Sequence, residues 1–482
     1  MTINNFFSGA AGTTLQDQWR NFCFSQGALG TVTQDLWIQF IQSWALAHSV
    51  TITGTLDDQT RRFLILYLGL SDTGQSVEDL WGLVTGPYSG ASIFPTIPDE
   101  NSTFNDEGTS TTGWTGSNAT LLVTGSTLRQ TKVAGGSNSS MTKTITFTPT
   151  SRDYLLYGSI RGRNNADTVS VIWMLNGSKE VSVWLGSNGT SVATPGMVTL
   201  VGTTGASTRN SATAMTGFDY ENNSVEFCLH FDSKYNTLTM YTRDVGGGYT
   251  YRARVACDWF DSTSVQLLTT TASLAGAWVE FDYVTLARPN ILAIGDSICE
   301  GKTLFSPNPA LGLTDYTSTW MKYCKIYQGL RNNLIIDKGV GGNTSAQILA
   351  RITDATGEGG RVIFLHASTN DVVGGISQVD RTTNIQSSVN AITASSASAV
   401  LLNAMYGTST APDNTPSPAL RDYMTTWWDT SSSTITGLAG RINIMSPVAG
   451  GGGFMASSLT QSDGLHPTPS GYSAIGAFIG AQ

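Results

Sequence analysis

From Asn290 to the C-terminus, short apolar segments alternate with longer segments of helical spacing. The apolar segments predict strands at 291–297, 334–337, 361–368, 399–406 and 442–446. Helices are predicted at 317–332, 344–355, 381–394, 418–430 and from about residue 470. This alternation is typical of a parallel sheet covered by helices on both faces. In such sheets, ligands bind at the carboxyl ends of the strands.

Polar residues that can perform chemistry follow these predicted strands. Ser297 ends the first strand, Asn370 follows the third, and His466 lies in the loop after the last. A serine hydroxyl becomes a good nucleophile when a base takes its proton, and histidine ionises close to neutral pH. Asp463 can accept a hydrogen bond from the other ring nitrogen of His466. We interpret His366, the rival base, as a strand residue.

Four separate blocks carry these residues in order. They are Gly295-Asp296-Ser297-Ile298-Cys299-Glu300-Gly301, Gly339-Val340-Gly341-Gly342-Asn343-Thr344, Ser368-Thr369-Asn370-Asp371 and Asp463-Gly464-Leu465-His466-Pro467. Over the last 190 residues or so, the sequence resembles the SGNH (GDSL-type) hydrolases. The resemblance implies a three-layer α/β fold at 289–482, carboxylic-ester hydrolysis without a cofactor, and Ser297, Asp463 and His466 as catalytic residues.

The resemblance also implies an oxyanion hole. Its donors are the N–H groups of Ser297 and Gly342 and the side-chain amide of Asn370. One position departs from the family pattern, because the third block usually begins with glycine and here begins with Ser368. We expect the extra hydroxymethyl group to narrow the site or shift Asn370. Asp296 and Asp371 are interpreted as residues that brace their loops.

Residues 106–288 have the alternating, β-branched pattern of an all-β region. About ten short segments, separated by turn residues, predict a β-sandwich of jelly-roll or concanavalin-like type. In texture the region is similar to carbohydrate-binding modules, in which exposed aromatic residues stack on sugars. Trp173, Trp184 and Trp259 are candidates, but a tryptophan in a strand is more typical of a core. We therefore assign no binding residue here.

The first 84 residues contain a weak internal repeat. Its four segments, 15–22, 33–40, 56–63 and 77–84, each have an aspartate in the third position. They predict a small α-helical region. This region resembles the short helical repeats of phage virion proteins, often found in an anchoring part; an ordinary helical domain is the alternative. Residues 85–105 are rich in proline, serine and asparagine and predict a linker.

Composition excludes several classes of partner. Charged residues make up 13% of the chain, against about 25% in ordinary domains, and the net charge of −9 includes no basic cluster. A nucleic-acid partner is therefore not expected. The longest apolar stretch, 63–70, is too short to span a membrane. The four histidines are isolated, so no metal site is expected.

The N-terminus does not have the pattern of a secretory signal, although the composition resembles that of extracellular or virion proteins. Both features suit a phage structural protein released by lysis. The sequence thus predicts a virion esterase of a tail fibre or tailspike, which removes O-acetyl groups from a bacterial surface polysaccharide. By analogy it is a homotrimer that joins other virion proteins through its N-terminal region. Two alternatives are a receptor-binding or head-fibre protein with a degenerate hydrolase fold, and a bacterial carbohydrate esterase with an accessory module.

Overall fold

The structure, a computed structural model, describes the chain from residue 102 to 480 with gaps, together with Phe94 and Ile97. The gaps are 135–138, 148–152, 164–169, 177–178, 188–192, 205–206, 215–223, 234–235, 244–248, 258–261, 270–274, 302–318, 325–330, 372–373, 404–422, 450–454 and 462. The predicted helical repeat at 1–84 lies outside the described residues, as does Trp259.

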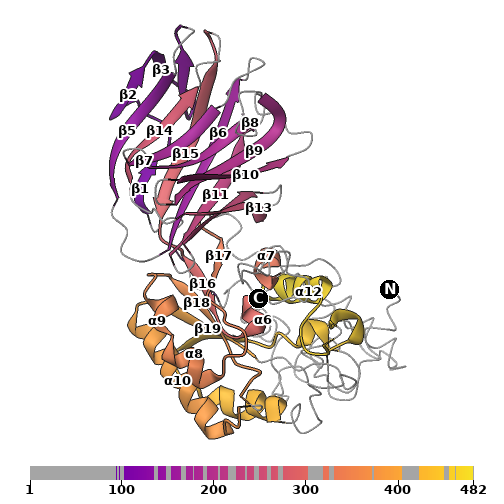
Figure 1. Ribbon diagram of the computed structural model, residues 1–482. Coiled ribbons are helices and arrows are strands. Elements are labelled where there is room, and N and C mark those ends of the chain that lie inside the picture. Colours follow the sequence, from indigo (N-terminus) through magenta and orange to yellow (C-terminus); the bar gives the residue numbers. More distant parts are fainter. Residues whose placement is uncertain are drawn as a thin grey trace, which may run out of the picture.

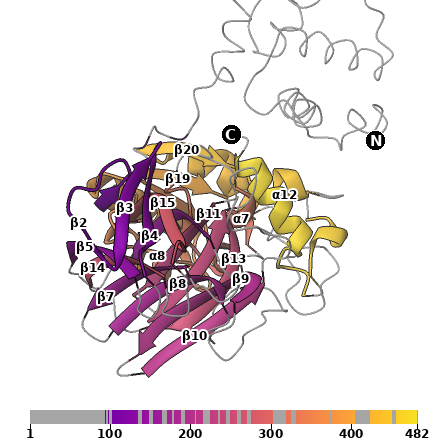
Figure 2. The same ribbon diagram turned by 90° about the horizontal axis from the view of Figure 1, so that it is seen from above.

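The central region is a sandwich of two antiparallel sheets (Figure 1), which confirms the predicted all-β region. The eight-stranded sheet contains β1 (Ser102–Asp106), β3 (Ala119–Thr124), β4 (Thr127–Lys132), β6 (Tyr154–Arg163), β11 (Val225–Asp232), β12 (Thr237–Arg243), β13 (Tyr249–Ala256) and β15 (Trp278–Ala287). The seven-stranded sheet contains β2 (Trp114–Ser117), β5 (Ser139–Phe147), β7 (Ser170–Asn176), β8 (Lys179–Ser187), β9 (Ala193–Thr204), β10 (Ser207–Ala214) and β14 (Ser262–Thr269). Figure 2 shows β7–β10 in a layer apart from β4, β11 and β15.

Apolar residues from both sheets fill the space between them, because side chains alternate along each strand. On β11, for example, Phe227, Leu229 and Phe231 belong to this core together with Met141 of β5. Trp173 and Trp184 lie on β7 and β8, and their side chains are outside the described set.

Five strands of the sandwich were not predicted: β1 to β4 and β10. The sequence of β10, Ser-Thr-Arg-Asn-Ser-Ala-Thr-Ala, has no apolar alternation to reveal it. β1 lies at the end of the predicted linker and pairs with β15. The sandwich therefore begins before the predicted boundary at residue 106.

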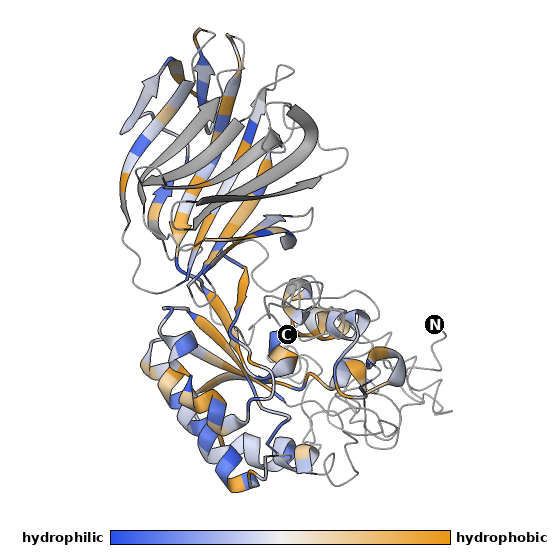
Figure 3. Cartoon of the chain, in the orientation of Figure 1, coloured by the Kyte–Doolittle hydropathy of each residue, from blue (hydrophilic) through white to orange (hydrophobic). Residues whose placement is uncertain are grey.

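The C-terminal region has a five-stranded parallel sheet in the order β17-β16-β18-β19-β20, which confirms the predicted α/β class. The strands are β16 (Ile291–Ile294), β17 (Ile335–Asp337), β18 (Val362–His366), β19 (Ser398–Leu402) and β20 (Leu438–Ile442). β16 and β18 are buried throughout and appear as the apolar centre of the domain in Figure 3. A strand predicted at 442–446 is wrong by four residues, since Ile442 ends β20.

Helices lie on both sides of this sheet (Figure 1). α8 (Ser345–Ala350), α9 (Thr353–Thr356) and α10 (Gln378–Ala394) cover one side, and α6 (Ser297–Glu300), α7 (Trp320–Tyr323) and α12 (Pro469–Gly480) the other. The helix predicted at 317–332 is wrong at its end, because Cys324 and residues 331–334 are not helical. α10 begins three residues earlier than predicted, because the Ser377 side chain accepts a hydrogen bond from the Asp380 N–H. Among the described helices, none is both long and apolar enough to cross a membrane.

The two regions are joined by only three residues, 288–290, between β15 and β16. Buried charges connect them as well. Lys338, which follows β17, lies 2.8 Å from Asp153 of the sandwich and 3.2 Å from Glu358 of its own domain. Asp153 also lies 2.8 Å from Nε2 of His230. The outer face of the eight-stranded sheet thus rests directly on the α/β domain.

Candidate active site

Ser297 begins α6 in a tight turn directly after β16. Asp296 is the N-cap of this helix, and its Oδ1 atom accepts from the Ile298 N–H at 3.0 Å. Gly295 permits the turn, because a Cβ atom there would lie 2.6 Å from Cβ of His366 and 2.8 Å from Cβ of Cys299. The turn places the Ser297 side chain at the carboxyl end of the sheet, where the residues of the other blocks arrive.

Ser297, His466 and Asp463 form a hydrogen-bonded row. Nε2 of His466 lies 2.8 Å from Oγ of Ser297, and Nδ1 lies 2.5 Å from Oδ2 of Asp463. The other oxygen of Asp463 accepts from the N–H groups of Leu465 and His466, each at 3.0 Å. Burial raises the pKa of Asp463, but these hydrogen bonds outweigh it and hold the pKa below the usual value. Asp463 therefore stays ionised and fixes the orientation of the ring.

His366, the rival base, lies elsewhere. It ends β18, is fully buried, and its Nδ1 atom lies 3.1 Å from Oδ1 of Asp296. Burial raises the pKa of Asp296. His366 and the N–H groups of Thr369 and Ile298 lower this pKa by more than burial raises it, so the net shift is downward. His366 and Asp296 thus support the turn that carries Ser297, as was predicted for Asp296.

Gly342 is an exposed residue of the loop between β17 and α8. Its φ of +81° is in the left-handed region, where a side chain is strained. A Cβ atom would meet nothing within 4 Å, so the backbone conformation, rather than crowding, requires glycine. The loop then enters α8 through Thr344 and Gln347, which form a reciprocal capping box.

Asn370 lies beside this loop. Its amide Nδ2 is 3.1 Å from the Asn343 carbonyl oxygen and 3.4 Å from Oδ2 of Asp296. Ser368 contacts Asn370 directly. The buried Ser368 hydroxyl donates to the Asn343 carbonyl at 2.6 Å and accepts from the Asn370 N–H at 2.9 Å.

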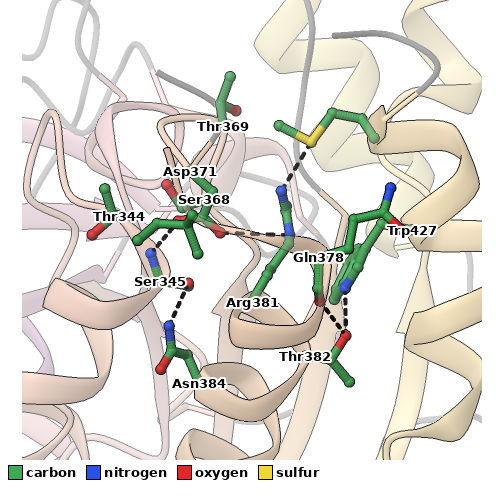
Figure 4. Close-up of polar contacts among 12 residues, drawn as sticks. Thr344, Ser345, Ser368, Thr369, Asp371, Gln378, Arg381, Thr382, Asn384 and Trp427 are labelled. Atoms are coloured by element: carbon green, nitrogen blue, oxygen red, sulfur yellow. Dashed lines mark hydrogen bonds and ion pairs between the residues drawn. The ribbon is translucent and has the colours of Figure 1, made fainter. Parts of the chain in front are cut away.

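Asp371 joins the Asn370 segment to α8 and α10 (Figure 4). Its Oδ1 atom accepts from the Ser345 N–H at 2.6 Å, at the start of α8. Its Oδ2 atom lies 3.6 Å from Nε of Arg381, a fully buried residue of α10. Burial raises the pKa of Asp371 despite Arg381 and the Ser345 N–H. The interpretation of Asp371 as a bracing residue agrees with these contacts.

The sequence did not reveal Arg351, which follows α8. Its Nε donates to Oδ1 of Asn343 at 2.6 Å, and its two terminal nitrogens each donate at 2.5 Å to the carbonyls of Lys338 and Gly295. One guanidinium group therefore joins the Ser297 turn to the Gly342 loop. In sequence it looks like any arginine near a helix end, so no signal pointed to this role.

A family model matches the same part of the chain. The model of the GDSL-like lipase/acylhydrolase family covers residues 293–474. These residues form a GDSL-like lipase/acylhydrolase domain. No curated protein matches the sequence.

Solved structures are similar to parts of the chain at low identity. One is a putative lipolytic G-D-S-L protein of Desulfitobacterium hafniense, with 14% identity, 39% of this chain and 97% of that chain covered, and a TM-score of 0.32. Another is a GDSL-like lipase of Bacteroides thetaiotaomicron, with 20% identity, 40% and 85% covered, and a TM-score of 0.31. A CBM2 module of an evolved Dit from Lactobacillus casei BL23 phage J-1 has 10% identity, 39% and 95% covered, and a TM-score of 0.31.

One further ionisable pair lies under the nucleophile turn of the GDSL-like domain. Oδ1 of Asp337, the last residue of β17, is 3.7 Å from Sγ of Cys299 and accepts from the Gly339 N–H at 2.6 Å. Burial raises the pKa of Asp337 to about 7 and the pKa of the Cys299 thiol well above its ordinary value. Cys299 is thus a packed, protonated side chain. Among the described residues, no group of three or more His, Cys, Asp or Glu side chains could hold a metal ion.

Proposed function

We propose that this protein is a serine ester hydrolase that removes O-acetyl groups from a bacterial surface polysaccharide, as part of a phage tail fibre or tailspike. The observation that carries the hydrolase is the 2.8 Å contact between Nε2 of His466 and Oγ of Ser297. A base at this distance can take the hydroxyl proton as the bond to the acyl carbon forms.

The reaction proceeds in two halves. Oγ of Ser297 attacks the ester carbonyl carbon, and its proton passes to Nε2 of His466. Asp463, held ionised, stabilises the imidazolium through Nδ1. His466 then returns the proton to the leaving sugar oxygen, which leaves an acyl-serine. Water, deprotonated by His466, attacks this acyl group, and carboxylic acid and free Ser297 are released.

The carbonyl oxygen carries negative charge in each tetrahedral intermediate. The donors proposed for it are the N–H groups of Ser297 and Gly342 and the amide of Asn370. The 3.4 Å contact of this amide with Asp296 is the longer of its two contacts, and the substrate oxygen replaces it. Each preorganised donor lowers the barrier by on the order of 3 kcal/mol.

The loops around Ser297 favour a small acyl group on a sugar. Gly342 is exposed, and Asn343, Thr344 and Asn370 are half-buried. A polar rim of this kind suits a substrate rich in hydroxyl groups, whereas a long acyl chain needs an apolar surface. The phage setting rests on the composition and on the repeat at 1–84.

The test is acetate release from a panel of O-acetylated capsular and O-antigen polysaccharides, with Ser297→Ala as control. We expect acetate from at least one polysaccharide with the native protein and none with the variant. If the native protein releases no acetate but cleaves longer p-nitrophenyl esters, the substrate class is wrong.

A fluorophosphonate probe separates the esterase from the non-enzymatic alternative. An active Ser297 is labelled, and the label is lost in Ser297→Ala. A degenerate site that only holds glycan is not labelled. The second alternative, a bacterial carbohydrate esterase, would perform the same chemistry. Whether the gene lies among phage genes or bacterial genes would distinguish it from a phage protein.

A further inference from the structure

Ser368 stands where two segments of the site meet. It is the second residue after β18 and is fully buried. Its hydroxyl donates to the carbonyl of Asn343, the residue after Gly342, and accepts from the backbone N–H of Asn370. A hydroxyl can donate and accept at once, so one side chain joins both segments.

A closed ring of hydrogen bonds results. Nδ2 of Asn370 also donates to the Asn343 carbonyl, at 3.1 Å. Asn370 is therefore held at two points, its backbone N–H by Ser368 and its side-chain amide by Asn343. These two points fix the χ angles that decide where the amide is directed.

On the proposed function of the site as an esterase, we infer that Ser368 is a positioning residue that aligns the Asn370 amide with the Gly342 loop to complete the oxyanion hole. Donors lower the barrier only when they are fixed in place before charge develops. Glycine or alanine at 368 leaves the Asn370 N–H without this acceptor. The amide is then held by its 3.1 Å contact alone, and a small misplacement of a donor costs rate.

The anchor on the other side of the ring is rigid. Arg351 donates to the side chain of Asn343 at 2.6 Å and to the Gly295 carbonyl at 2.5 Å. Ser368 thus ties Asn370 to a loop that is itself tied to the Ser297 turn. The departure from the family's glycine supplies a contact that glycine cannot make.

The first measurement is the turnover of p-nitrophenyl acetate by Ser368→Ala. We expect kcat to fall about 10- to 100-fold, less than the loss of a whole donor, with KM within about twofold of the native value. Ser432→Ala is the matched control, because Ser432 is equally buried and donates to the Trp428 carbonyl at 2.6 Å. It should lose stability without losing kcat.

A double-mutant cycle with Asn370→Ala tests whether Ser368 acts through Asn370. If it does, Ser368→Ala causes little further loss of kcat once the amide is gone. A purely structural role would instead add its full effect in both backgrounds. Thermal unfolding of each variant shows that it is folded, and Ser368→Gly serves as the second variant if Ser368→Ala is not.

Native kcat in folded Ser368→Ala or Ser368→Gly, or additive losses in the cycle, would overturn the positioning role while leaving the esterase intact. A native protein that neither turns over the ester nor reacts with the fluorophosphonate would overturn the proposed function itself, and this inference with it.

Discussion

Nζ of Lys338 lies 2.8 Å from Oδ2 of Asp153, in a buried ion pair that crosses from the GDSL-like domain to the sandwich. Burial lowers the pKa of Lys338, but Asp153 and Glu358 raise it more, so the net shift is upward. For Asp153, burial has the opposite effect and raises the pKa. Lys338 and His230 outweigh it and bring the pKa of Asp153 below its ordinary value. Both groups are therefore charged in the folded protein.

We expect Lys338→Met to lower the free energy of unfolding by about 3–5 kcal/mol, because it leaves Asp153 buried without its cation. Urea unfolding measures the loss. The control is Glu226→Gln, which breaks the more exposed pair with Arg243, and it should cost less than about 1 kcal/mol. Equal losses in the two variants would contradict a structural role for the buried pair.

Asp463→Asn should lower kcat by about 10⁴-fold, because an amide no longer selects the tautomer in which Nε2 of His466 can accept the Ser297 proton. Steady-state hydrolysis of p-nitrophenyl acetate measures this. Asp371→Asn, which retains an oxygen for the Ser345 N–H, is the comparison and should lose far less. Similar losses in both would show that Asp463 only braces its loop.

Substitution of the two candidate bases, His466 and His366, should affect different measured quantities, kcat for the first and stability for the second. His466→Asn is expected to lower kcat by at least about 10⁴-fold, since it removes the base. His366→Asn is expected to lower the free energy of unfolding by about 1–3 kcal/mol, since it removes one of the polar partners of buried Asp296. Both kcat and the free energy of unfolding are measured for each variant. A full loss of kcat in stable His366→Asn would make His366 a member of the reaction.

Asp337 should make stability depend on pH. Its pKa in the folded protein is about 7, above the ordinary value of 3.8. A carboxyl group whose pKa is raised by folding contributes its full stability at pH values below the ordinary pKa. This contribution is lost as the pH rises through the folded pKa of about 7. Asp337→Asn cannot ionise, so the variant should gain on the order of 2 kcal/mol relative to the native protein between pH 5 and pH 8. Urea unfolding at both values tests this, and an unchanged difference would contradict burial as the cause.

The sequence predicted the parts of the site that depend on strand ends. Ser297 and Asn370 follow apolar segments, and parallel strands bring their carboxyl ends to one edge. The geometry places His466 beside Ser297, and Asn370 beside Asn343, the residue after Gly342. The hydrogen bonds of Ser368 could not be predicted, because a residue type does not show where its hydroxyl is directed.

Other features could not be predicted because their causes lie far away in sequence. Arg351 acts on Gly295, 56 residues earlier, and Lys338 on Asp153, 185 residues earlier. β10 is polar, and its sequence does not show that it pairs with β9. The start of α10 was misplaced because the cap at Ser377 decides it.

The three-residue connection between β15 and β16 leaves no slack between the two domains. A long flexible tether would let two domains sample many separations. Here the offset between the sandwich surface and Ser297 is built into the backbone. The separation between the sandwich and Ser297 is therefore a fixed property of the fold rather than one that varies with a flexible tether.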